Sequence, residues 1–279
     1  MEQLKATELA RIANSIRFGI IESVYNAKCG HPGGSLSIAD IMAYLYFEEM
    51  KVDPSNPKDP MRDRFVLSKG HTAPALYSTL AERGFFPKED LKTLRKTSSY
   101  LQGHPDMKSV PGVDMSTGSL GQGVSAACGM ALSSKLAGSP YRVYTVVGDG
   151  ESEEGQVWEA AMFASHYKLD NLVLILDLNG LQIDGPITEV MNPMPHDEKF
   201  AAFGWNVITI NAHDFNEIEA AFAKARETKG RPTAIIAKSV KGKGVSYMEN
   251  ACEWHGQAPK EDLYRVAIAD LTKISEELK

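Results

Sequence analysis

The chain has 279 residues, of which 43% are hydrophobic, and this length suits one large α/β domain or two small ones. Its formal net charge of −6 argues against nucleic acid and anionic membranes as partners, and no apolar run is long enough to span a bilayer. The N-terminus lacks the apolar core of a signal peptide, and the three separated cysteines form no metal-binding pair. We therefore expect a reduced, cytoplasmic protein without a zinc site.

The first third of the chain predicts helices around one short strand. Apolar residues at helical spacing begin near the N-terminus and stop at Gly30. Ser37 and Asp40 have the spacing of a capping box that opens the next helix. The stretch DRFVLSKG predicts a short buried strand, and TAPALYSTLAERG predicts a helix closed by Gly84.

Strands and helices alternate in the remainder of the chain. The predicted helix Ser119–Gly138 is rich in small residues, which indicates that another group approaches its backbone closely. The later elements are, in order, a strand, a helix, two strands, a helix, a strand and a helix: Val143–Val147, Gln156–Tyr167, Leu172–Asp177, Trp205–Ile210, Asn216–Thr228, Thr233–Lys238 and 260–278. This alternation predicts an α/β fold with a parallel sheet sandwiched by helices, in a single domain over 1–279 with a long glycine-containing loop at 238–259.

An acidic glycine turn follows the strand that begins at Val143. Gly148, Asp149 and Gly150 form the turn, and the next four residues contain three glutamates. A glycine turn after a strand suits a phosphate, but carboxylates repel one. A divalent cation between carboxylate and phosphate would remove this contradiction.

Asn179 follows Asp149 by 30 residues, and each comes directly after a predicted strand. If the two strands are parallel neighbours, both side chains reach the sheet edge at which open α/β folds bind ligands. Carboxylate, amide and carbonyl oxygens suit Mg²⁺ or Ca²⁺ rather than zinc. The alternative interpretation of the same turn is an ordinary tight turn without a ligand.

These residues resemble the thiamine diphosphate motif, in which Asp-Gly is followed by Asn-Gly about thirty residues later. Seven stretches resemble transketolases in the same order: GHPGGSLSIAD (30–40), LSKGHTAPALY (67–77), GHPD (103–106), STGSLGQGVSAACGMA (116–131), GDGESEEGQVWEA (148–160), DLNGLQIDG (177–185) and KGKGVS…WHG (241–256). Together they extend over nearly the whole chain. The chain thus resembles the N-terminal, diphosphate-binding subunit of a split transketolase.

The resemblance implies a metal site and a cofactor site. The metal, Mg²⁺ with Ca²⁺ or Mn²⁺ as substitutes, would be held by Asp149, Asn179 and the carbonyl of Leu181. The residues implied to contact thiamine diphosphate are His71, Gly118, Leu120, Gly148, Asp149, Gly150, Glu154, Asn179 and His255. Glu154 matches an acid that links the two active sites of a dimer, and Glu159 belongs to the same network, so the glutamates are expected to face another chain.

The resemblance also implies catalytic residues, namely His31, His71, His104, His255 and Glu154. Imidazole has an unperturbed pKa near 6.5, so these histidines are expected to transfer protons near neutral pH. His31 and His104 would contact the substrate, and His71 and His255 would contact the cofactor and the reacting carbon. Three histidines match no motif and are expected to be turn or surface residues: His166, His196 and His213.

The resemblance is restricted to the first domain of transketolases. Nothing in the chain resembles the domain whose glutamate activates the aminopyrimidine ring, nor the basic residues that bind a sugar phosphate. It therefore implies a partner, a C-terminal transketolase subunit with pyrimidine-binding and C-terminal domains, in an assembly with two copies of each chain. The implied reaction is transfer of a two-carbon ketol unit between sugar phosphates, as in the pentose phosphate pathway.

Other functions stay open at this point. The chain could be a subunit of a 2-oxo-acid decarboxylase or dehydrogenase, a relative of deoxyxylulose-phosphate synthases, or a non-catalytic cofactor-binding scaffold. The lysines of KGKG, Lys241 and Lys243, could bind a phosphate or lie in a solvated loop.

Overall fold

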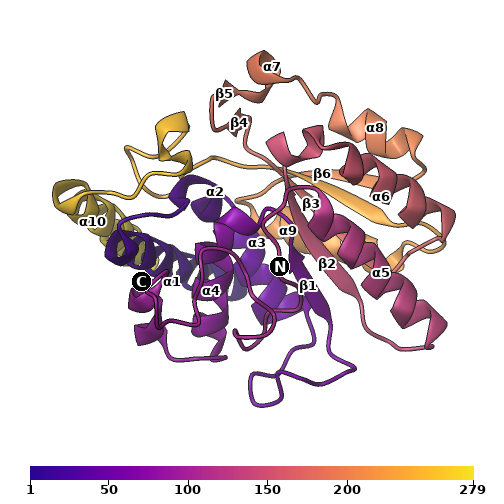
Figure 1. Cartoon of the computed structure of the whole chain (residues 1–279), viewed down its shortest axis with the longest axis horizontal. Coiled ribbons are helices and arrows are strands. Elements are labelled where there is room, and N and C mark those ends of the chain that lie inside the picture. The colour runs from indigo at the N-terminus through magenta and orange to yellow at the C-terminus, as the bar shows by residue number, and fades with distance from the viewer.

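A computed structural model describes residues Met1–Lys279 and contains a five-stranded parallel sheet in the order β1-β2-β3-β7-β6 (Figure 1). A two-stranded antiparallel hairpin, β4-β5, lies beside the main sheet. The strands are β1 Arg64–Leu67, β2 Val143–Gly148, β3 Leu172–Leu178, β4 Leu181–Gln182, β5 Gly185–Pro186, β6 Asn206–Asn211 and β7 Thr233–Lys238.

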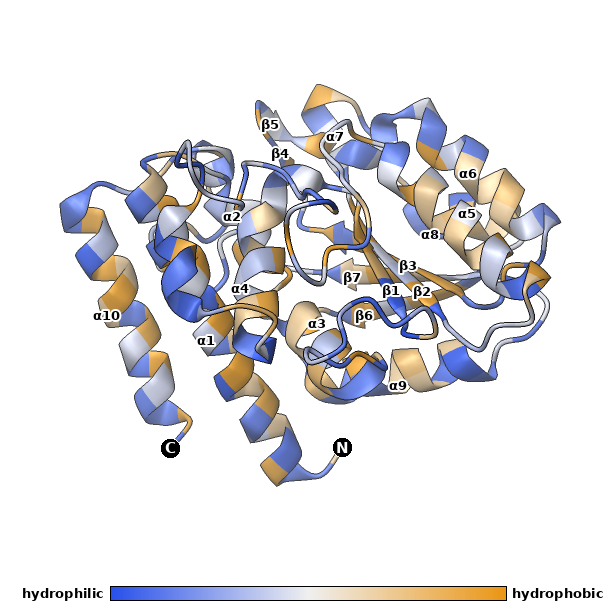
Figure 2. Cartoon of the chain, turned by 60° about the horizontal axis from the view of Figure 1, so that its bottom comes forward, coloured by the Kyte–Doolittle hydropathy of each residue, from blue (hydrophilic) through white to orange (hydrophobic).

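The central strands are apolar because they are covered on both faces. Every residue of β2 is buried, as are the first six of β3, which is the pattern of a parallel sheet between two helical layers. The predicted parallel α/β sandwich is therefore confirmed, and each of the five predicted strands ends within about two residues of its expected position. In Figure 2 these orange strands lie between helices striped in blue and orange.

Two hydrophobic clusters, of 49 and 19 buried residues, fill the two sides of the sheet. The larger cluster lies on one side of the sheet and joins the buried faces of five helices, of which α10 packs on α1 rather than on the sheet: α1 Gln3–Ala27, α3 Ala39–Tyr44, α4 Ala73–Arg83, α9 Phe215–Glu227 and α10 Glu261–Glu277. The smaller one packs helices against the other face: α5 Gln122–Leu136, α6 Gly155–His166 and α8 His196–Ala202. Alternate residues of β2 and β3 contribute to each cluster because strand side chains alternate between faces.

The predicted helix end at Gly84 is confirmed, since this residue closes α4 with a φ of 94°. The first helix ends at Ala27, before the predicted stop at Gly30, because Lys28 adopts a left-handed φ of 57°. Helix α5 begins at Gln122, three residues later than predicted, because Gly121 with φ 79° is incompatible with a helical turn. A Cβ on Gly123 would lie 2.6 Å from the Ser68 Cα, so the expected close approach occurs at the start of this helix.

The predicted capping box at the start of α3 is wrong. The helix begins at Ala39, and its N-cap residue, Ile38, makes no side-chain cap. Ser37 Oγ lies 2.8 Å from the Asp177 carboxylate instead, and Asp40 pairs with Arg17. Distant charged partners therefore replaced the local cap, because charge-assisted hydrogen bonds are the stronger ones.

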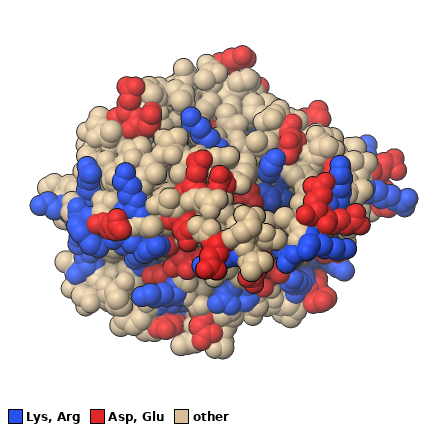
Figure 3. Space-filling view, turned by 180° about the vertical axis from the view of Figure 1, so that it is seen from behind, with Lys and Arg blue, Asp and Glu red and all other residues tan.

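Sequence patterns also missed the shortest elements, since too few residues repeat in them to show a period. The missed helical pieces are α2 Pro32–Leu36, α7 Ile187–Val190 and α8, whereas the predicted helix over 37–50 ends in a π-helical turn, Leu45–Glu49. None of the helices combines the length and the apolar character needed to cross a membrane. On the face shown in Figure 3, acidic and basic side chains are interspersed.

Candidate functional site

A cavity of about 610 Å³ opens at the carboxyl ends of β1, β2 and β3. Ten residues singled out from the sequence line it: His71, Gly118, Leu120, Gly148, Asp149, Gly150, Glu154, Asn179, Leu181 and His255. The other two, His31 and His104, lie outside the lining set. The cavity is at the sheet edge expected for ligands in parallel α/β folds.

Asp149 is buried at the floor of this cavity. Its carboxylate accepts hydrogen bonds from the backbone N–H groups of Gly150 at 2.9 Å and Gly180 at 2.6 Å. These bonds join the turn after β2 to the turn after β3. Burial and the nearby charge of Asp177 raise the pKa of Asp149 to about 7, because only backbone amides donate to this carboxylate.

Asn179 and Leu181 bring two neutral oxygens to the same place. Asn179 Nδ2 donates to Asp177 Oδ2 at 2.9 Å, and its Oδ1 accepts from the Leu181 N–H at 3.1 Å, so the amide is oriented from both ends. The Leu181 carbonyl accepts a hydrogen bond from Lys241 Nζ at 2.8 Å. A carboxylate, an amide oxygen and a carbonyl therefore line one cavity.

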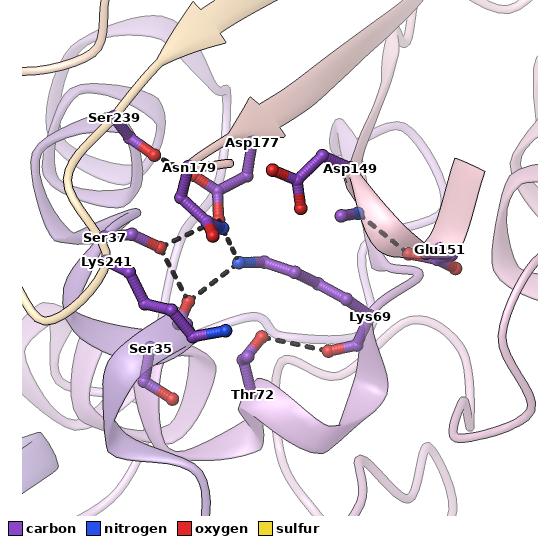
Figure 4. A network of polar contacts seen from close by, with 12 residues as sticks. Ser35, Ser37, Lys69, Thr72, Asp149, Glu151, Asp177, Asn179, Ser239 and Lys241 are labelled. Atoms are coloured by element: carbon purple, nitrogen blue, oxygen red, sulfur yellow. Dashed lines mark hydrogen bonds and ion pairs between the residues drawn. The ribbon is translucent and has the colours of Figure 1, made fainter. Parts of the chain in front are cut away.

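Sequence reasoning missed a buried ion pair at this edge. Lys69 Nζ lies 2.6 Å from Asp177 Oδ2 and donates to the Gly34 carbonyl at 2.7 Å. Burial raises the pKa of Asp177, but the charge of Lys69 together with the hydrogen bonds from Lys69, Ser239 and Ser37 outweighs burial and holds this pKa below its usual value. Figure 4 shows Lys69 and Lys241 approaching the cavity from opposite sides. Both members of the missed pair stand inside motifs of the sequence, Lys69 in SKG and Asp177 in DLNG.

The two lysines of the KGKG stretch have different environments. The Lys241 residue is 1% exposed, and its Nζ lies 2.9 Å from His255 Nδ1. Burial lowers the pKa of Lys241 to about 8. The Lys243 side chain is 38% exposed and pairs with Glu249. The solvated-loop interpretation is thus wrong for Lys241 and correct for Lys243.

The glutamates of the acidic turn point in different directions. Glu151 is buried, and its carboxylate accepts from the N–H groups of Gly121 at 2.9 Å and Gly148 at 3.0 Å. The expectation that all these glutamates face another chain is therefore wrong for Glu151, which organises the cavity backbone. Glu154 and Glu159 are exposed.

Three of the expected catalytic histidines form a cluster. The ring centres of His31 and His71 lie 5.1 Å apart, and those of His71 and His255 lie 5.2 Å apart. His104 lies beside the cluster, where a Cβ added to Gly118 would meet its ring at 3.1 Å. The fold thus collects four histidines from four separate loops at one edge of the cavity.

These histidines do not have the neutral-range pKa expected from the sequence. Burial, assisted by the positive charge of Arg95, lowers the pKa of His31 to about 4. Burial and the charge of Lys241 lower that of His255 to about 3. Burial likewise lowers the pKa of His71 and His104. All four imidazoles are therefore neutral at neutral pH, and each ring then has one donor and one acceptor nitrogen.

Two of the three histidines outside the motifs are not surface residues. His196 is buried, with its Nε2 2.8 Å from Ser152 Oγ. His213 bonds to Asp40. Only His166 is exposed as expected. Spacing alone gave no sign of the first two, since their partners lie 44 and 173 residues away along the chain.

Comparison with known proteins places this geometry in a family. Residues 9–271 match the family model described as "Transketolase, thiamine diphosphate binding domain". The chain is 47% identical over 267 residues to the 6-deoxy-6-sulfo-D-fructose transketolase subunit SqwG of Clostridium sp. (strain MSTE9), covering 95% of this chain and 97% of that protein. It is 42% identical over 277 residues to one subunit of the apulose-4-phosphate transketolase of Phocaeicola vulgatus, covering 99% and 98% respectively.

A solved transketolase from Campylobacter jejuni superposes with a TM-score of 0.89 at 35% sequence identity. The match covers 98% of this chain but only 43% of that enzyme. The shared sheet, the cavity at its carboxyl edge and the full-length match to two separate transketolase subunits lead to one conclusion. The chain belongs to the transketolase family and comprises its thiamine diphosphate-binding domain, in the form of an N-terminal subunit.

Proposed function

We propose that this chain, together with a separate C-terminal subunit, transfers a two-carbon ketol unit from a ketose phosphate to an aldose phosphate. Thiamine diphosphate and Mg²⁺ are the cofactors. The observation that carries the proposal is the convergence, in one cavity, of three oxygen donors from Asp149, Asn179 and Leu181 with the ammonium groups of Lys69 and Lys241. Such a cavity offers a cation site and an anion site side by side.

The donor set fits a hard divalent cation. Mg²⁺ prefers oxygen ligands and completes its coordination with phosphate and water. The raised pKa of Asp149 reports a carboxylate without a counter-charge, which a bound cation would supply. The Leu181 carbonyl already attracts a positive group, the ammonium of Lys241. Ca²⁺ or Mn²⁺ would substitute for Mg²⁺ with the same ligands.

The residues around the cation site fit a diphosphate. Gly150 begins a helical turn after β2, and its lack of a side chain lets an anion approach the backbone there, although its own N–H donates to Asp149. The ammonium groups of Lys69 and Lys241 border the same space and add positive charge. When bound, thiamine diphosphate supplies the chemistry that breaks and forms carbon–carbon bonds. The protein holds it in place and excludes water.

The neutral histidines supply hydrogen bonds at the reacting end. His71 and His255 line the cavity, where a neutral imidazole accepts a proton or orients a hydroxyl. His31 and His104 lie beside them, and in our proposal they meet the sugar. Their low pKa values make them proton acceptors rather than acids in the resting enzyme.

Two copies of each subunit form the proposed assembly. The two relatives described above are named as subunits, and this chain spans less than half of the Campylobacter enzyme. In the assembly, the partner would hold the aminopyrimidine ring, and the exposed Glu154 would contact a second copy at the rim of the cavity. One relative is named for a sulfonated ketose and the other for a sugar phosphate, so both carry an anionic group. We expect phosphorylated sugars, in the cytoplasm, for this chain.

The test is reconstitution. The chain would be co-purified with its C-terminal partner, then assayed with Mg²⁺, thiamine diphosphate and a panel of ketose phosphates and sulfonates. We expect ketol transfer that requires both chains. A complex that binds the cofactor but transfers no ketol unit from any donor would contradict the proposal. Release of carbon dioxide from 2-oxo acids by that complex would favour a decarboxylase instead.

A further inference from the structure

The Lys241 ammonium reaches the cavity from a loop that needs external support. Residues 239–244 follow β7 and include two glycines in the left-handed region, Gly242 with φ 79° and Gly244 with φ 93°. The loop makes two turn hydrogen bonds of its own, from the Lys243 N–H to the Val240 carbonyl and from the Val245 N–H to the Gly242 carbonyl, and neither involves the backbone of Lys241. Its support comes from three side chains of other elements, namely Arg17 in α1, Asp40 in α3 and His213 before α9.

His213 holds the loop on one side of Lys241. Its Nε2 lies 3.0 Å from the backbone nitrogen of Val240, and its Nδ1 lies 2.7 Å from Asp40 Oδ2. A backbone N–H can only donate, so Nε2 must be the acceptor and carries no proton. Nδ1 then carries the proton and donates to Asp40. The ring is therefore neutral, in one tautomer, with its orientation set by a carboxylate.

Arg17 holds the loop on the other side. Its guanidinium bonds both oxygens of Asp40, and its Nε donates to the Lys243 carbonyl at 3.1 Å. Burial raises the pKa of Asp40, but the charge of Arg17 and the hydrogen bonds from His213 and Arg17 outweigh burial and hold it well below its usual value. A Cβ on Gly244 would lie 3.0 Å from Arg17 Cδ, so the loop packs directly on this side chain.

The loop has other anchors that keep its general path. The Gly242 N–H donates to the Gly33 carbonyl at 2.9 Å, and Ser239 bonds to the Asp177 carboxylate. Glu249, whose carboxylate accepts from the Gly244 N–H at 3.0 Å, is a further charged group close to His213. Loss of one contact should therefore loosen the loop around Lys241 without unfolding the domain.

We propose that Arg17, Asp40 and His213 form a loop clamp that positions Lys241 in the cavity, with the Val240–His213 hydrogen bond as its critical contact. These are positioning residues, since none of the three lines the cavity. This inference rests on the proposed function in one respect, namely that the Lys241 ammonium, once positioned, binds a diphosphate.

Two substitutions separate the two contacts of His213. In His213→Gln the amide oxygen reaches roughly the position of Nε2 and can still accept from Val240, but contact with Asp40 is lost. In His213→Asn the amide reaches only the position of Nδ1, so the contact with Asp40 is kept and the acceptor for Val240 is lost. The pair is matched in chemistry and differs in the contact that it retains.

The readout is the reactivity of Lys241 in the full chain without ligand, measured by reductive methylation and mass spectrometry. Labelling of the more exposed Lys243 is the internal reference for the amount of reagent. Lys69 is buried at the other side of the cavity, so it stays unlabelled as long as the fold is intact. We expect Lys241 labelling to rise about fivefold in His213→Asn, which corresponds to about 1 kcal/mol of local stability. We expect less than about a twofold rise in His213→Gln.

Equal Lys241 labelling in both variants, whether high or low, would overturn the clamp. If Lys69 also becomes reactive in His213→Asn, the variant has lost its fold, and the proposal is then tested on the wild-type protein. Nitrogen NMR of its His213 ring at neutral pH should then show a protonated Nδ1 and a bare Nε2. The opposite tautomer or an imidazolium would overturn the proposal without any variant.

A second arm tests the link to the cofactor in the assembled complex. Mg²⁺ and thiamine diphosphate should protect Lys241 further, and His213→Asn should raise the cofactor concentration for half protection about fivefold. If the ligand-free result holds but the cofactor gives no protection, the clamp stands and the proposed role of Lys241 fails. If Lys241 is protected equally in both variants and in the wild type, the clamp fails while the cofactor site stands.

Discussion

The two ends of the central sheet hold cavities of similar volume, but the buried carboxylate at each end has different partners. The carboxyl-end cavity measures about 610 Å³, and a cavity of about 540 Å³ lies at the amino end, beside the start of β1. At the amino end Asp114 accepts from the guanidinium groups of Arg62 and Arg64 and from the Phe65 N–H. At the carboxyl end only backbone amides donate to Asp149.

This contrast teaches that volume and buried charge do not by themselves mark a site. At the amino end Arg62 and Arg64 satisfy the buried carboxylate of Asp114, which is the pattern of a structural ion pair, and the other two lining cations, Lys58 and Lys108, are exposed. The Lys241 ammonium faces a neutral carbonyl and a neutral imidazole, so it and Asp149 keep charge available for a ligand. Unpaired buried charge with a shifted pKa is typical of functional sites. The same type of substitution should therefore act differently at the two ends.

The largest effect is expected from Asp149→Ala. It removes the only charged oxygen donor in the proposed metal set, so cofactor affinity of the assembled enzyme should fall on the order of 1,000-fold, equivalent to about 4 kcal/mol. Calorimetric titration of thiamine diphosphate at fixed Mg²⁺ measures this. The stability of the ligand-free chain should change little, because removal of a buried carboxylate is offset by loss of its hydrogen bonds from Gly150 and Gly180. Unchanged cofactor affinity would contradict the metal site.

The next effect concerns the amino end. Asp114→Asn leaves Arg62 buried without its counter-charge, so the free energy of unfolding should fall by about 3–5 kcal/mol. Urea unfolding measures this change. Cofactor affinity of the folded fraction should stay within about twofold of the wild type, because the residue is at the opposite end of the sheet. If Asp114→Asn lowered cofactor affinity without lowering the free energy of unfolding, the amino-end cavity would act as a ligand site rather than as a structural ion pair.

Acidification should destabilise the carboxyl end through its histidines. Their folded pKa values are lowered, so the unfolded chain binds more protons as pH falls below about 6.5, and this favours unfolding. Asp149, with its raised pKa, acts in the opposite sense, since the folded state then takes up the proton. Between pH 7 and 6 we expect a net loss of about 1–2 kcal/mol.

Unfolding by urea at a series of pH values measures this loss. His255→Asn should flatten the pH dependence, and His166→Asn, on the exposed side of α6, should leave it unchanged. A pH dependence that is the same in both variants would show that the clustered histidines are not its source.

The remaining prediction compares two glycines of α5. A Cβ on Gly123 would lie 2.6 Å from the Ser68 Cα at the cavity edge, so Gly123→Ala should destabilise by about 1–3 kcal/mol. Gly129, six residues further on, has open space where a Cβ would lie, so Gly129→Ala should stabilise by about 0.5–1 kcal/mol. Thermal unfolding of the two variants checks both signs. Equal changes would mean that only helix propensity matters here.

The sheet was predictable because its strands are buried on both faces and read as apolar runs, as in β2 and β3. The metal donors and the four clustered histidines were predictable because each stands in a motif with fixed spacing. The capping box failed because its local pattern is satisfied equally well by remote partners. Lys69 and Asp177 were missed because nothing in the strand patterns marks a lysine and an aspartate as a pair.

The sequence by itself determined the alternation of strands and helices, the sheet edge at which the loops meet, and the oxygen donors that follow β2 and β3. Only the tertiary structure decided which neighbouring residues point inward, such as Glu151 rather than Glu154 and Lys241 rather than Lys243. Only it decided that the histidines are neutral and that Arg17, Asp40 and His213 meet. The physical reason is that spacing controls local geometry, whereas burial and charge pairing depend on partners brought from distant parts of the chain.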